Sequence, residues 1–319
     1  MLRIGLLGAA AIAPTALIRP ARTLPDVEVV AVAARDPERA IAFARRHRIG
    51  RVYRRYEGLL ADPAIDAVYI PLPNALHAEW TIRALDAGKH VLVEKPFAIS
   101  TAEATQMVTA AAKNGKVLLE GFAYLHHPLA QRLRDSTREI GSLCRVEADF
   151  LVSILRPGNI RWRPELGGGS LLDAGCYPIS LVRWLFQQEM HVVRARAILA
   201  HSGVDRTIEA EFAAGEQTAR IRASLRSRHG FRSLARLIGE KGQLWVLNPF
   251  QPSFGYLLVV LGKQARRVEW GRGEDIYRAQ LRGFQNAIAG RDAPIGLDDA
   301  TAHMKLIDAV HHAAGLGGR

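Results

Sequence analysis

The segment formed by residues 66–97 constrains the fold most, because it reads as a strand, a turn, a helix and a second strand. The apolar run at residues 68–70 is typical of a strand buried on both faces, and Gly88 marks the end of the helix. The second strand, residues 90–93, leads directly toward Lys95. The sequence therefore places a lysine at the carboxyl end of a parallel strand, which is where open α/β sheets bind ligands.

The same alternation of strands and helices extends over the first part of the chain. Buried strands are expected at residues 2–7 and 28–33, a helix at 101–114 and a further strand at 116–120. This rhythm predicts an α/β fold with a doubly wound parallel sheet of the Rossmann type, in a dinucleotide-binding domain that spans residues 1–121.

The remainder of the chain changes pattern and predicts an α+β domain at residues 122–319. Residues 145–150 alternate between apolar and polar, as in a strand with one wet face. Consecutive strands without intervening helices favour a large, mostly antiparallel open sheet, which helices at 276–289 and 299–313 follow. The other strands of this sheet are expected around residues 192–200, 206–214, 217–225, 232–238, 243–247, 256–261 and 266–270.

Composition narrows the class of protein. The chain is 49% hydrophobic and 23% charged, and it has no apolar run long enough to span a bilayer. With two cysteines and no secretory signal recognised after Met1, we expect a cytoplasmic enzyme without a membrane partner. The formal net charge is +12, with its densest basic run at residues 45–55. Because this run lacks a groove-reading motif and interleaved aromatic residues, we expect no nucleic-acid partner, and the positive field favours anionic cofactors.

The turn after the first strand is the expected position of a glycine-rich dinucleotide turn, G-x-G-x-x-G. Gly8 keeps the first glycine, whereas Ala10 and Ala13 occupy the other two positions. Alanine is tolerated at the third position, but the second glycine normally lets the backbone approach the pyrophosphate. Taken alone, this pattern also fits any strand–helix turn of an α/β protein.

The end of the second strand bears on which nicotinamide cofactor binds. An NAD site usually carries an acid here for the ribose hydroxyls, but Ala33 and Ala34 are followed by Arg35. A guanidinium can pair with the 2′-phosphate of NADP. The sequence therefore predicts a preference for NADP(H), with NAD(H) possible if Asp36 binds the ribose and Arg35 is a solvated charge.

A second glycine-rich segment lies inside the α+β domain. Residues 167–169 are three glycines that run into a helix carrying Asp173 and Tyr177 on one face. The glycines alone fit a flexible loop, and the two side chains alone fit a buried hydrogen-bonded pair without chemistry. Together with Lys95, they indicate an acid–base site.

These motifs together resemble the Gfo/Idh/MocA family of oxidoreductases. The matching segments are the turn at Gly8, residues 71–77, residues 94–96 and residues 167–177, in the order expected of that family. They cover the chain from its start to about residue 185, whereas the later strands and helices carry no diagnostic motif.

Within the family, the chain resembles the branch of trans-dihydrodiol dehydrogenases, D-xylose dehydrogenases and glucose–fructose oxidoreductase. Tyr177 stands where inositol dehydrogenase-like members have histidine, and residues 120–128 are similar to that branch. Leu125 departs from it, since arginine is common at this position.

The resemblance implies an NAD(P)-dependent oxidoreductase. The expected reaction transfers a hydride between the nicotinamide and a hydroxyl or carbonyl carbon of a carbohydrate-like small molecule, namely a sugar, polyol or dihydrodiol. Lys95, Asp173 and Tyr177 are the expected catalytic residues, and no metal is expected. The residues expected to bind the cofactor are Gly8, Ala10, Ala11, Ile12, Arg35, Pro71, Leu72, Asn74, His77, Glu94, Lys95, Trp162 and Arg163.

The expected chemistry leaves the formal acid open between Lys95 and Tyr177. An ammonium at Lys95 stabilises negative charge on a carbonyl oxygen, and it would lower the pKa of a nearby phenol that donates the proton. Asp173 could orient the substrate or tune Lys95. Two other classes stay open: a non-catalytic dinucleotide-binding sensor, and a nicotinamide-dependent glycosidase or lyase that uses transient oxidation.

The α+β domain is also expected to mediate self-association. Residues 207–212 and 218–225 carry apolar side chains at alternate positions, and few helices are available to cover both faces of the sheet. Covering an open face with a second copy is a common solution. We therefore expect a homodimer or homotetramer built on this domain.

Overall fold

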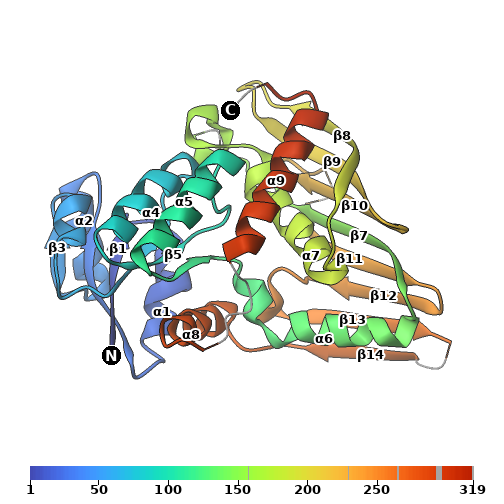
Figure 1. Ribbon diagram of the computed structural model, residues 1–319, viewed down its shortest axis with the longest axis horizontal. Helices are drawn as coiled ribbons and strands as arrows, with labels where there is room; N and C mark the ends of the chain where they lie inside the picture. The colour runs from blue at the N-terminus through green and yellow to red at the C-terminus, as the bar shows by residue number, and fades with distance from the viewer. Residues whose placement is uncertain (157, 229, 264–265, 292–296, 318–319) are drawn as a thin grey trace. The chain divides into compact units, whose positions relative to one another are not determined.

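The computed structural model describes residues 1–156, 158–228, 230–263, 266–291 and 297–317 of the chain, as drawn in Figure 1. The chain divides into two compact units. The first consists of Met1–His126 and Tyr277–Thr301, and the second of His127–Ile276 and Ala302–Arg319. Among the described helices, none is long and apolar enough to cross a membrane.

The first unit is built on a six-stranded parallel sheet with the order β3-β2-β1-β4-β5-β6. This order is that of a Rossmann fold and confirms the predicted doubly wound sheet. The central strands are buried on both faces, which explains their continuous apolar runs. The strands are β1 (Leu2–Leu7), β2 (Val27–Ala33), β3 (Arg51–Tyr53), β4 (Ala67–Ile70), β5 (His90–Val93) and β6 (Leu118–Glu120).

The helices of the first unit begin and end where the sequence supplies caps. Asp36 caps α2 by accepting from the backbone N–H of Glu38 at 3.0 Å, and Ser100 caps α5 in the same way. Gly115 ends α5 in the left-handed conformation. The helices are η1 (Pro14–Ile18), α1 (Arg19–Ala21), α2 (Pro37–His47), α3 (Tyr56–Leu60), η2 (Asn74–Leu76), α4 (His77–Asp86), α5 (Thr101–Asn114), η3 (Ala123–His126) and α8 (Ile276–Ile288).

Helix α8 belongs with the first unit, although it follows the strands of the second unit in the sequence. Its Leu281 and Phe284 are buried in the same hydrophobic core as Leu6 and Leu17. The boundary therefore differs from the one expected at residue 121. Apolar periodicity predicted the helix itself, but it does not tell which core an amphipathic helix covers.

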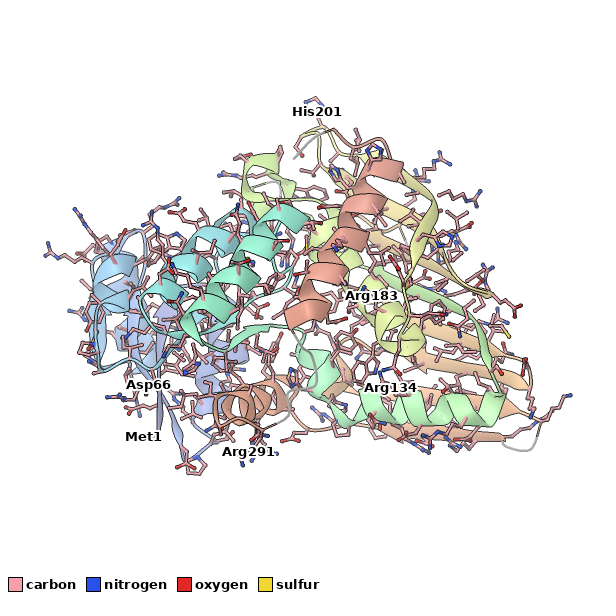
Figure 2. The ribbon with its side chains drawn as sticks, viewed as in Figure 1. Met1, Asp66, Arg134, Arg183, His201 and Arg291 are labelled. Atoms are coloured by element: carbon pink, nitrogen blue, oxygen red, sulfur yellow. The ribbon has the colours of Figure 1, made fainter. Side chains whose placement is uncertain are left out.

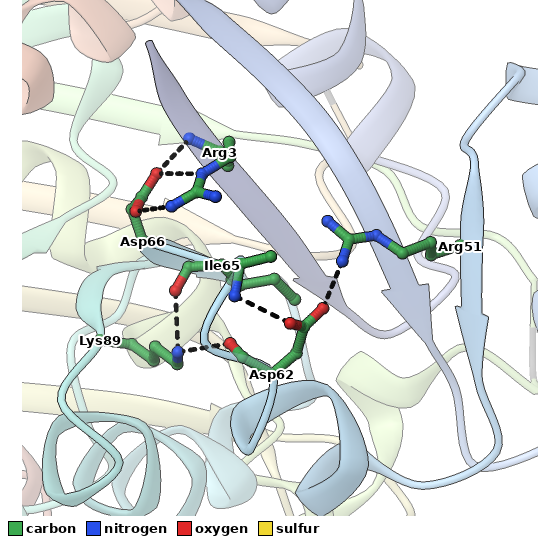
Figure 3. A network of polar contacts seen from close by, with 7 residues as sticks. Arg3, Arg51, Asp62, Ile65, Asp66 and Lys89 are labelled. Carbon is green, nitrogen blue, oxygen red and sulfur yellow. Dashed lines mark hydrogen bonds and ion pairs between the residues drawn. The ribbon is translucent and has the colours of Figure 1, made fainter.

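The N-terminal ends of the parallel strands are joined by a polar network, shown in Figure 3. Arg3 donates to the carboxylate of Asp66 from Nε at 2.9 Å and from Nη2 at 2.7 Å, which lowers the pKa of that carboxyl. The buried ammonium of Lys89 donates to the backbone carbonyl oxygens of Asp62 and Ile65 at 2.7 and 2.8 Å. These contacts tie the loop before β4 to β1 and β5.

The second unit is built on an eight-stranded sheet with the order β14-β13-β12-β11-β7-β10-β9-β8. Its pairings are antiparallel except for β10 with β7, which confirms the predicted mostly antiparallel sheet. The strands are β7 (Leu143–Leu151), β8 (His191–Leu199), β9 (Asp205–Ala214), β10 (Gln217–Ser224), β11 (Arg232–Gly239), β12 (Gly242–Leu247), β13 (Tyr256–Gly262) and β14 (Arg266–Gly271).

Helices cover one face of this sheet. Arg134 of α6 is labelled in Figure 2, and its guanidinium carbon lies 3.7 Å from the centroid of the Trp184 ring. The Nη2 of Arg134 also donates to the backbone oxygen of Trp184 at 2.8 Å. These two contacts join α6 to α7. The helices are α6 (Pro128–Thr137), η4 (Arg138–Ile140), η5 (Ile160–Trp162), η6 (Pro164–Leu166), η7 (Leu171–Gly175), α7 (Cys176–Phe186), η8 (Pro252–Phe254) and α9 (Leu297–Ala313), of which the last begins in the first unit.

The expectation that β9 and β10 leave apolar side chains uncovered was wrong. Ile208, Phe212 and Ile221 are each at most 1% exposed, because α7 and the helical turn η7 pack against this part of the sheet. The opposite face of these strands carries ion pairs instead. Arg222 pairs with Asp149 at 2.6 Å, and similar pairs join neighbouring strands.

Candidate active site

The turn after β1 has the geometry of a dinucleotide-binding loop. Gly8 adopts a positive φ of 107°, and a Cβ at this position would lie 2.9 Å from the side chain of Leu72. Only glycine fits both conditions. Ala10 is half-buried, whereas Ala11 and Ile12 are exposed. This loop is therefore accessible at the carboxyl end of β1.

The segment after β2 presents arginine rather than carboxylate. Asp36 is engaged in capping α2, whereas Arg35 is exposed. Arg39, which the sequence pattern did not single out, donates from Nη2 to the backbone oxygen of Ala9 at 3.1 Å. Burial raises the pKa of the Tyr56 phenol, and the nearby Arg35 acts in the opposite direction. This corner of the first unit is therefore positively charged beside the loop after β1.

Lys95 follows β5, as expected, and its segment is held on two sides. The peptide bond between Lys95 and Pro96 is cis. The hydroxyl of Tyr69 donates to the carboxylate of Glu94 at 2.5 Å. The backbone oxygen of Pro96 lies 2.8 Å from Nδ1 of His77. The side chain of Glu94 on one side of the lysine, and the backbone of Pro96 on the other, are therefore held by the buried Tyr69 and His77.

His77 is fully buried between two loops. Its Nδ1 and Nε2 lie 2.8 and 2.9 Å from the backbone oxygens of Pro96 and Leu72. Burial lowers its pKa to about 4, although the contacts with the backbone oxygens of Pro96 and Leu72 act in the opposite direction. The ring thus joins the segments that follow β4 and β5. Of the other predicted residues in these segments, Pro71 is buried, and Leu72 and Asn74 are half-buried.

Glu120, at the end of β6, is a buried acid that sequence reasoning missed. It is 4% exposed, and its Oε1 accepts from the backbone N–H of Phe97 at 2.8 Å. Burial raises its pKa to about 8, although the hydrogen bond from Phe97 and the charge of Lys95 oppose this shift. The structure thus places a protonated carboxyl next to the segment that carries Lys95.

Replacing Glu120 by glutamine should remove a loss of stability that develops between about pH 4.5 and 8. The folded pKa of about 8 lies above the reference value of 4.5, so the folded state holds the proton more tightly than the unfolded state. The wild type should therefore lose stability as pH rises from about 4.5 to 8, with a slope approaching about 1.4 kcal/mol per pH unit. Glutamine keeps the acceptor for Phe97. Urea unfolding at several pH values should show the two proteins diverging across this window, and parallel curves would contradict the prediction.

In the second unit, the glycine run closes against the segment before it. The N–H of Gly169 donates to the backbone oxygen of Arg161 at 3.0 Å, and a Cβ on Gly168 would lie 2.6 Å from the same oxygen. Gly169 has a φ of 116°, and a Cβ there would lie 2.1 Å from the carboxylate of Asp205. The glycines are required by close packing and do not form a flexible loop.

Asp205 anchors the helix that follows the glycines. Its Oδ2 accepts from the hydroxyl of Ser170 and from the backbone N–H of Leu171, both at 2.7 Å. A buried carboxylate that accepts from a first-turn N–H stabilises a helix start. No local pattern predicts this contact, because Asp205 lies on β9, far from the glycine run in the sequence.

Asp173 and Tyr177 lie one turn apart on this helix, as predicted. Asp173 belongs to the π-helical turn η7 and Tyr177 to α7. The Nε of Arg161 donates to Oδ2 of Asp173 at 2.6 Å. The ring of Tyr177 packs against Phe150 and Phe250, with centroids 5.0 and 5.6 Å away. The ring of Tyr177 is thus packed against two aromatic rings of the second unit.

The predicted site residues fall into two groups. Lys95 and the other cofactor candidates before residue 97 belong to the first unit, and Asp173 and Tyr177 to the second. The candidates Trp162 and Arg163 lie in the second unit, beside Arg161, where Trp162 is half-buried and Arg163 exposed. Within the described residues, no group of three or more histidines, cysteines or acids is arranged to hold a metal ion.

Family models describe both parts of the chain. The model of the oxidoreductase family with an NAD-binding Rossmann fold matches residues 2–122, and that of the GFO/IDH/MocA C-terminal domain matches residues 130–245. A dTDP-3,4-didehydro-2,6-dideoxy-alpha-D-glucose 3-reductase of Streptomyces violaceoruber is 34% identical, over 99% of this chain and 96% of that protein. The chain belongs to the GFO/IDH/MocA oxidoreductase family.

Two further GFO/IDH/MocA proteins bear on the branch and the fold. A trans-1,2-dihydrobenzene-1,2-diol dehydrogenase of Xenopus laevis is 40% identical over 58% of each chain. The crystal structure of a 3-ketoreductase from Actinomadura kijaniata, in complex with NADP and TDP-benzene, superposes with a TM-score of 0.92. It is 29% identical, and the match covers 98% of this chain and 97% of that one. These findings confirm the resemblance and the fold class expected from the sequence.

The residues of the first unit fit a nicotinamide dinucleotide. Gly8 leaves room for a close approach to the backbone at the end of β1, and its positive φ turns the chain toward η1. Of the alanines that replace the other two glycines of the motif, Ala10 is half-buried and Ala13 is buried. Arg35 supplies a positive charge at the end of β2, where a carboxylate would repel a 2′-phosphate.

Proposed function

We propose that the protein is an NADP(H)-dependent enzyme that interconverts a hydroxyl and a carbonyl group on a sugar, polyol or dihydrodiol. Membership of the GFO/IDH/MocA oxidoreductases supports the reaction class. The observation that carries the proposal is the pair of Asp173 and Tyr177 on one helix, fixed by Arg161 and by the glycine run. A protein that only sensed the dinucleotide would have no need of a tyrosine and an acid held in this way.

Lys95, Tyr177 and Asp173 divide the acid–base chemistry in this proposal. Reduction of a carbonyl develops negative charge on oxygen, which an ammonium at Lys95 stabilises. Tyr177 supplies the proton, or returns it in the reverse direction. Asp173 orients the substrate and is itself oriented by Arg161. The bound nicotinamide supplies or accepts the hydride.

The proposed cofactor contacts lie in both units. The backbone of Gly8, Ala10, Ala11 and Ile12 would receive the pyrophosphate, and Arg35 the 2′-phosphate of NADP(H). The segments that follow β4 and β5 would flank the nicotinamide. They contain Pro71, Leu72, Asn74, His77, Glu94 and Lys95, and the second unit would add Trp162 and Arg163. His77 would act by fixing the two segments, because its ring nitrogens face backbone oxygens.

A substrate panel tests the proposal directly. Aldoses, polyols, dihydrodiols and dicarbonyl compounds would be incubated with NADP⁺ or NADPH, and the absorbance of the reduced nicotinamide would be followed. Stoichiometric change with one class supports the proposal and names the substrate. Tight cofactor binding without turnover of any compound would favour a dinucleotide sensor. Product formed with only catalytic amounts of cofactor would favour a glycosidase or lyase.

Self-association of the second unit is part of the proposal, on a different surface from the one first expected. On the face of β11–β14 away from the helices, Leu247, Leu257 and Trp270 stand opposite one another across strands, and Trp245, Val259 and Val268 form the next row. Trp270 is 74% exposed and Val268 66%. An exposed group of large apolar side chains is typical of an interface, and a twofold copy of the same face is its simplest partner. We propose a homodimer or homotetramer in the cytoplasm.

Replacing Trp270 by glutamate should shift this assembly to the monomer. The carboxylate would be buried without a partner against the copy of the same patch, a cost of several kcal/mol at each contact. Size-exclusion chromatography with light scattering at micromolar concentration measures the change. The matched control is Arg194→Glu, on an exposed edge strand at the other end of the sheet. A monomeric wild type, or a Trp270 variant of unchanged mass, would contradict the proposed surface.

A further inference from the structure

We propose that Arg161 is a positioning residue for this reaction: its guanidinium fixes the carboxylate of Asp173 and supplies a permanent positive charge beside the phenol of Tyr177. This inference rests on the proposed function, because it assigns Arg161 a role through Asp173 and Tyr177. The segment that holds Arg161 lies before the glycine run, twelve residues before Asp173, and it carries the side chain to the helix that bears both groups.

The guanidinium of Arg161 is held from two directions. Its Nε donates to Oδ2 of Asp173 at 2.6 Å, and its Nη1 lies 3.4 Å from Oδ1 of Asn159. The same Asn159 oxygen accepts from the backbone N–H of Arg161 at 3.1 Å, which fixes the short helical turn η5. The side chain therefore has little freedom to leave Asp173.

The backbone of Arg161 is held as firmly as its side chain. Its carbonyl oxygen accepts from the N–H of Gly169 at 3.0 Å. Because a Cβ on Gly168 would lie 2.6 Å from this oxygen, the approach is possible only with glycine at that position. The glycine run thus joins Arg161 to the start of the helix that carries Tyr177, and Asp205 holds that start from the other side.

Electrostatics connects the three side chains. The charge and the hydrogen bond of Asp173 raise the pKa of Arg161 in spite of burial, and the charge of an ionised Tyr177 adds to this effect. Charge interactions are reciprocal, so the guanidinium favours the ionised phenol, whereas Asp173 on the preceding turn disfavours it. The rings of Phe150 and Phe250, which face Tyr177 from β7 and from the segment after β12, are uncharged.

Replacing Arg161 by glutamine should therefore leave the Asp173 carboxylate without its counter-charge beside Tyr177. We expect the pKa of the Tyr177 phenol to rise, and the alkaline limb of the pH–rate profile to move in the same direction. We also expect kcat at neutral pH to fall about tenfold, because proton exchange becomes slower as the phenol becomes a weaker acid. Removing Asp173 as well, in Arg161→Gln/Asp173→Asn, should return the phenol pKa toward that of the wild type.

The deciding measurement does not require a substrate. Ultraviolet difference titration of each protein against its own Tyr177→Phe counterpart isolates this phenol from the other six tyrosines of the chain. The matched control is Arg3→Gln. Arg3 also pairs with an aspartate and has the same 37% side-chain exposure as Arg161, but it lies at the N-terminal edge of the first sheet. An upward shift in Arg161→Gln alone supports the inference.

An unchanged titration in Arg161→Gln, or a shift equal to that of the control, would overturn it. Arg161→Lys is a second variant that keeps the positive charge, and it separates the loss of charge from a disruption of the fold. Its phenol pKa is expected to lie between those of the wild type and Arg161→Gln. A lysine variant that titrates like the glutamine variant would show that charge is not the cause. Since the titration uses free enzyme, failure of the substrate panel would leave this result unaffected.

Discussion

Replacing Lys95 by methionine is expected to lower kcat by about 100-fold or more, with little change in cofactor affinity. The ammonium is needed most when negative charge develops on the substrate oxygen, so its removal raises the barrier more than it weakens binding. Methionine keeps the length of the side chain, and the neighbouring residues Glu94 and Pro96 are held by Tyr69 and His77. Steady-state kinetics on the substrate found by the panel, together with fluorescence titration of NADPH, measures both quantities.

Tyr177→Phe should cause a loss of similar size, and the two losses should not add. Both side chains are proposed to act on one oxygen, so the double variant should be little slower than the slower single variant. Phenylalanine keeps the ring contacts with Phe150 and Phe250. Near-normal kcat in Lys95→Met would remove its catalytic role and favour the sensor. Near-normal kcat in Tyr177→Phe alone would leave Lys95 as the acid and give Tyr177 a role in packing or substrate positioning.

Replacing Arg35 by alanine should weaken NADPH binding by about 10- to 100-fold and leave NADH binding nearly unchanged. A charge-assisted pair with a phosphate contributes about 1.5–3 kcal/mol, which corresponds to this range. Asp36 is engaged in capping α2, so it offers no ready substitute contact to the ribose. Both dissociation constants must be measured at the same ionic strength, because the pairing with phosphate is screened by salt.

Arg46→Ala is the matched control for this cofactor prediction. It removes the same charge from an exposed position on α2, in the same unit but away from the strand end. An equal loss of NADPH affinity in both variants would show that the general positive field is responsible. Equal affinity of the wild type for NADH and NADPH, or an unchanged ratio in Arg35→Ala, would show that Arg35 does not select the cofactor.

Local patterns in the sequence were sufficient for most elements of the fold. Helix α5 spans Thr101–Asn114 as predicted, because its cap at Ser100, its periodicity and the glycine at its end are all adjacent in the chain. The strands of the second sheet lie within a few residues of their expected positions for the same reason. A strand's own sequence shows its alternation, and thus its two faces.

Features that depend on partners distant in the sequence could not be predicted. The apolar patch that includes Trp270 arises from the register between β12, β13 and β14, which the individual strands do not specify. The raised pKa of Glu120 depends on complete burial behind the segment after β5. Asp205 lies 34 residues from Leu171, whose backbone N–H donates to its carboxylate. In the sequence Arg161 resembles an ordinary loop arginine, and only the structure shows its contact with Asp173.

The return of helix α8 to the first core limits how this protein can be cut and recombined. A fragment that ends at His126 would lack Leu281 and Phe284, which complete the core around Leu17, and it would expose that apolar surface to water. A chimera designed to exchange cofactor preference must therefore transplant two separate stretches of sequence, the N-terminal 126 residues and the stretch beginning at Tyr277. A single crossover point would produce a cofactor module with part of its own interior missing.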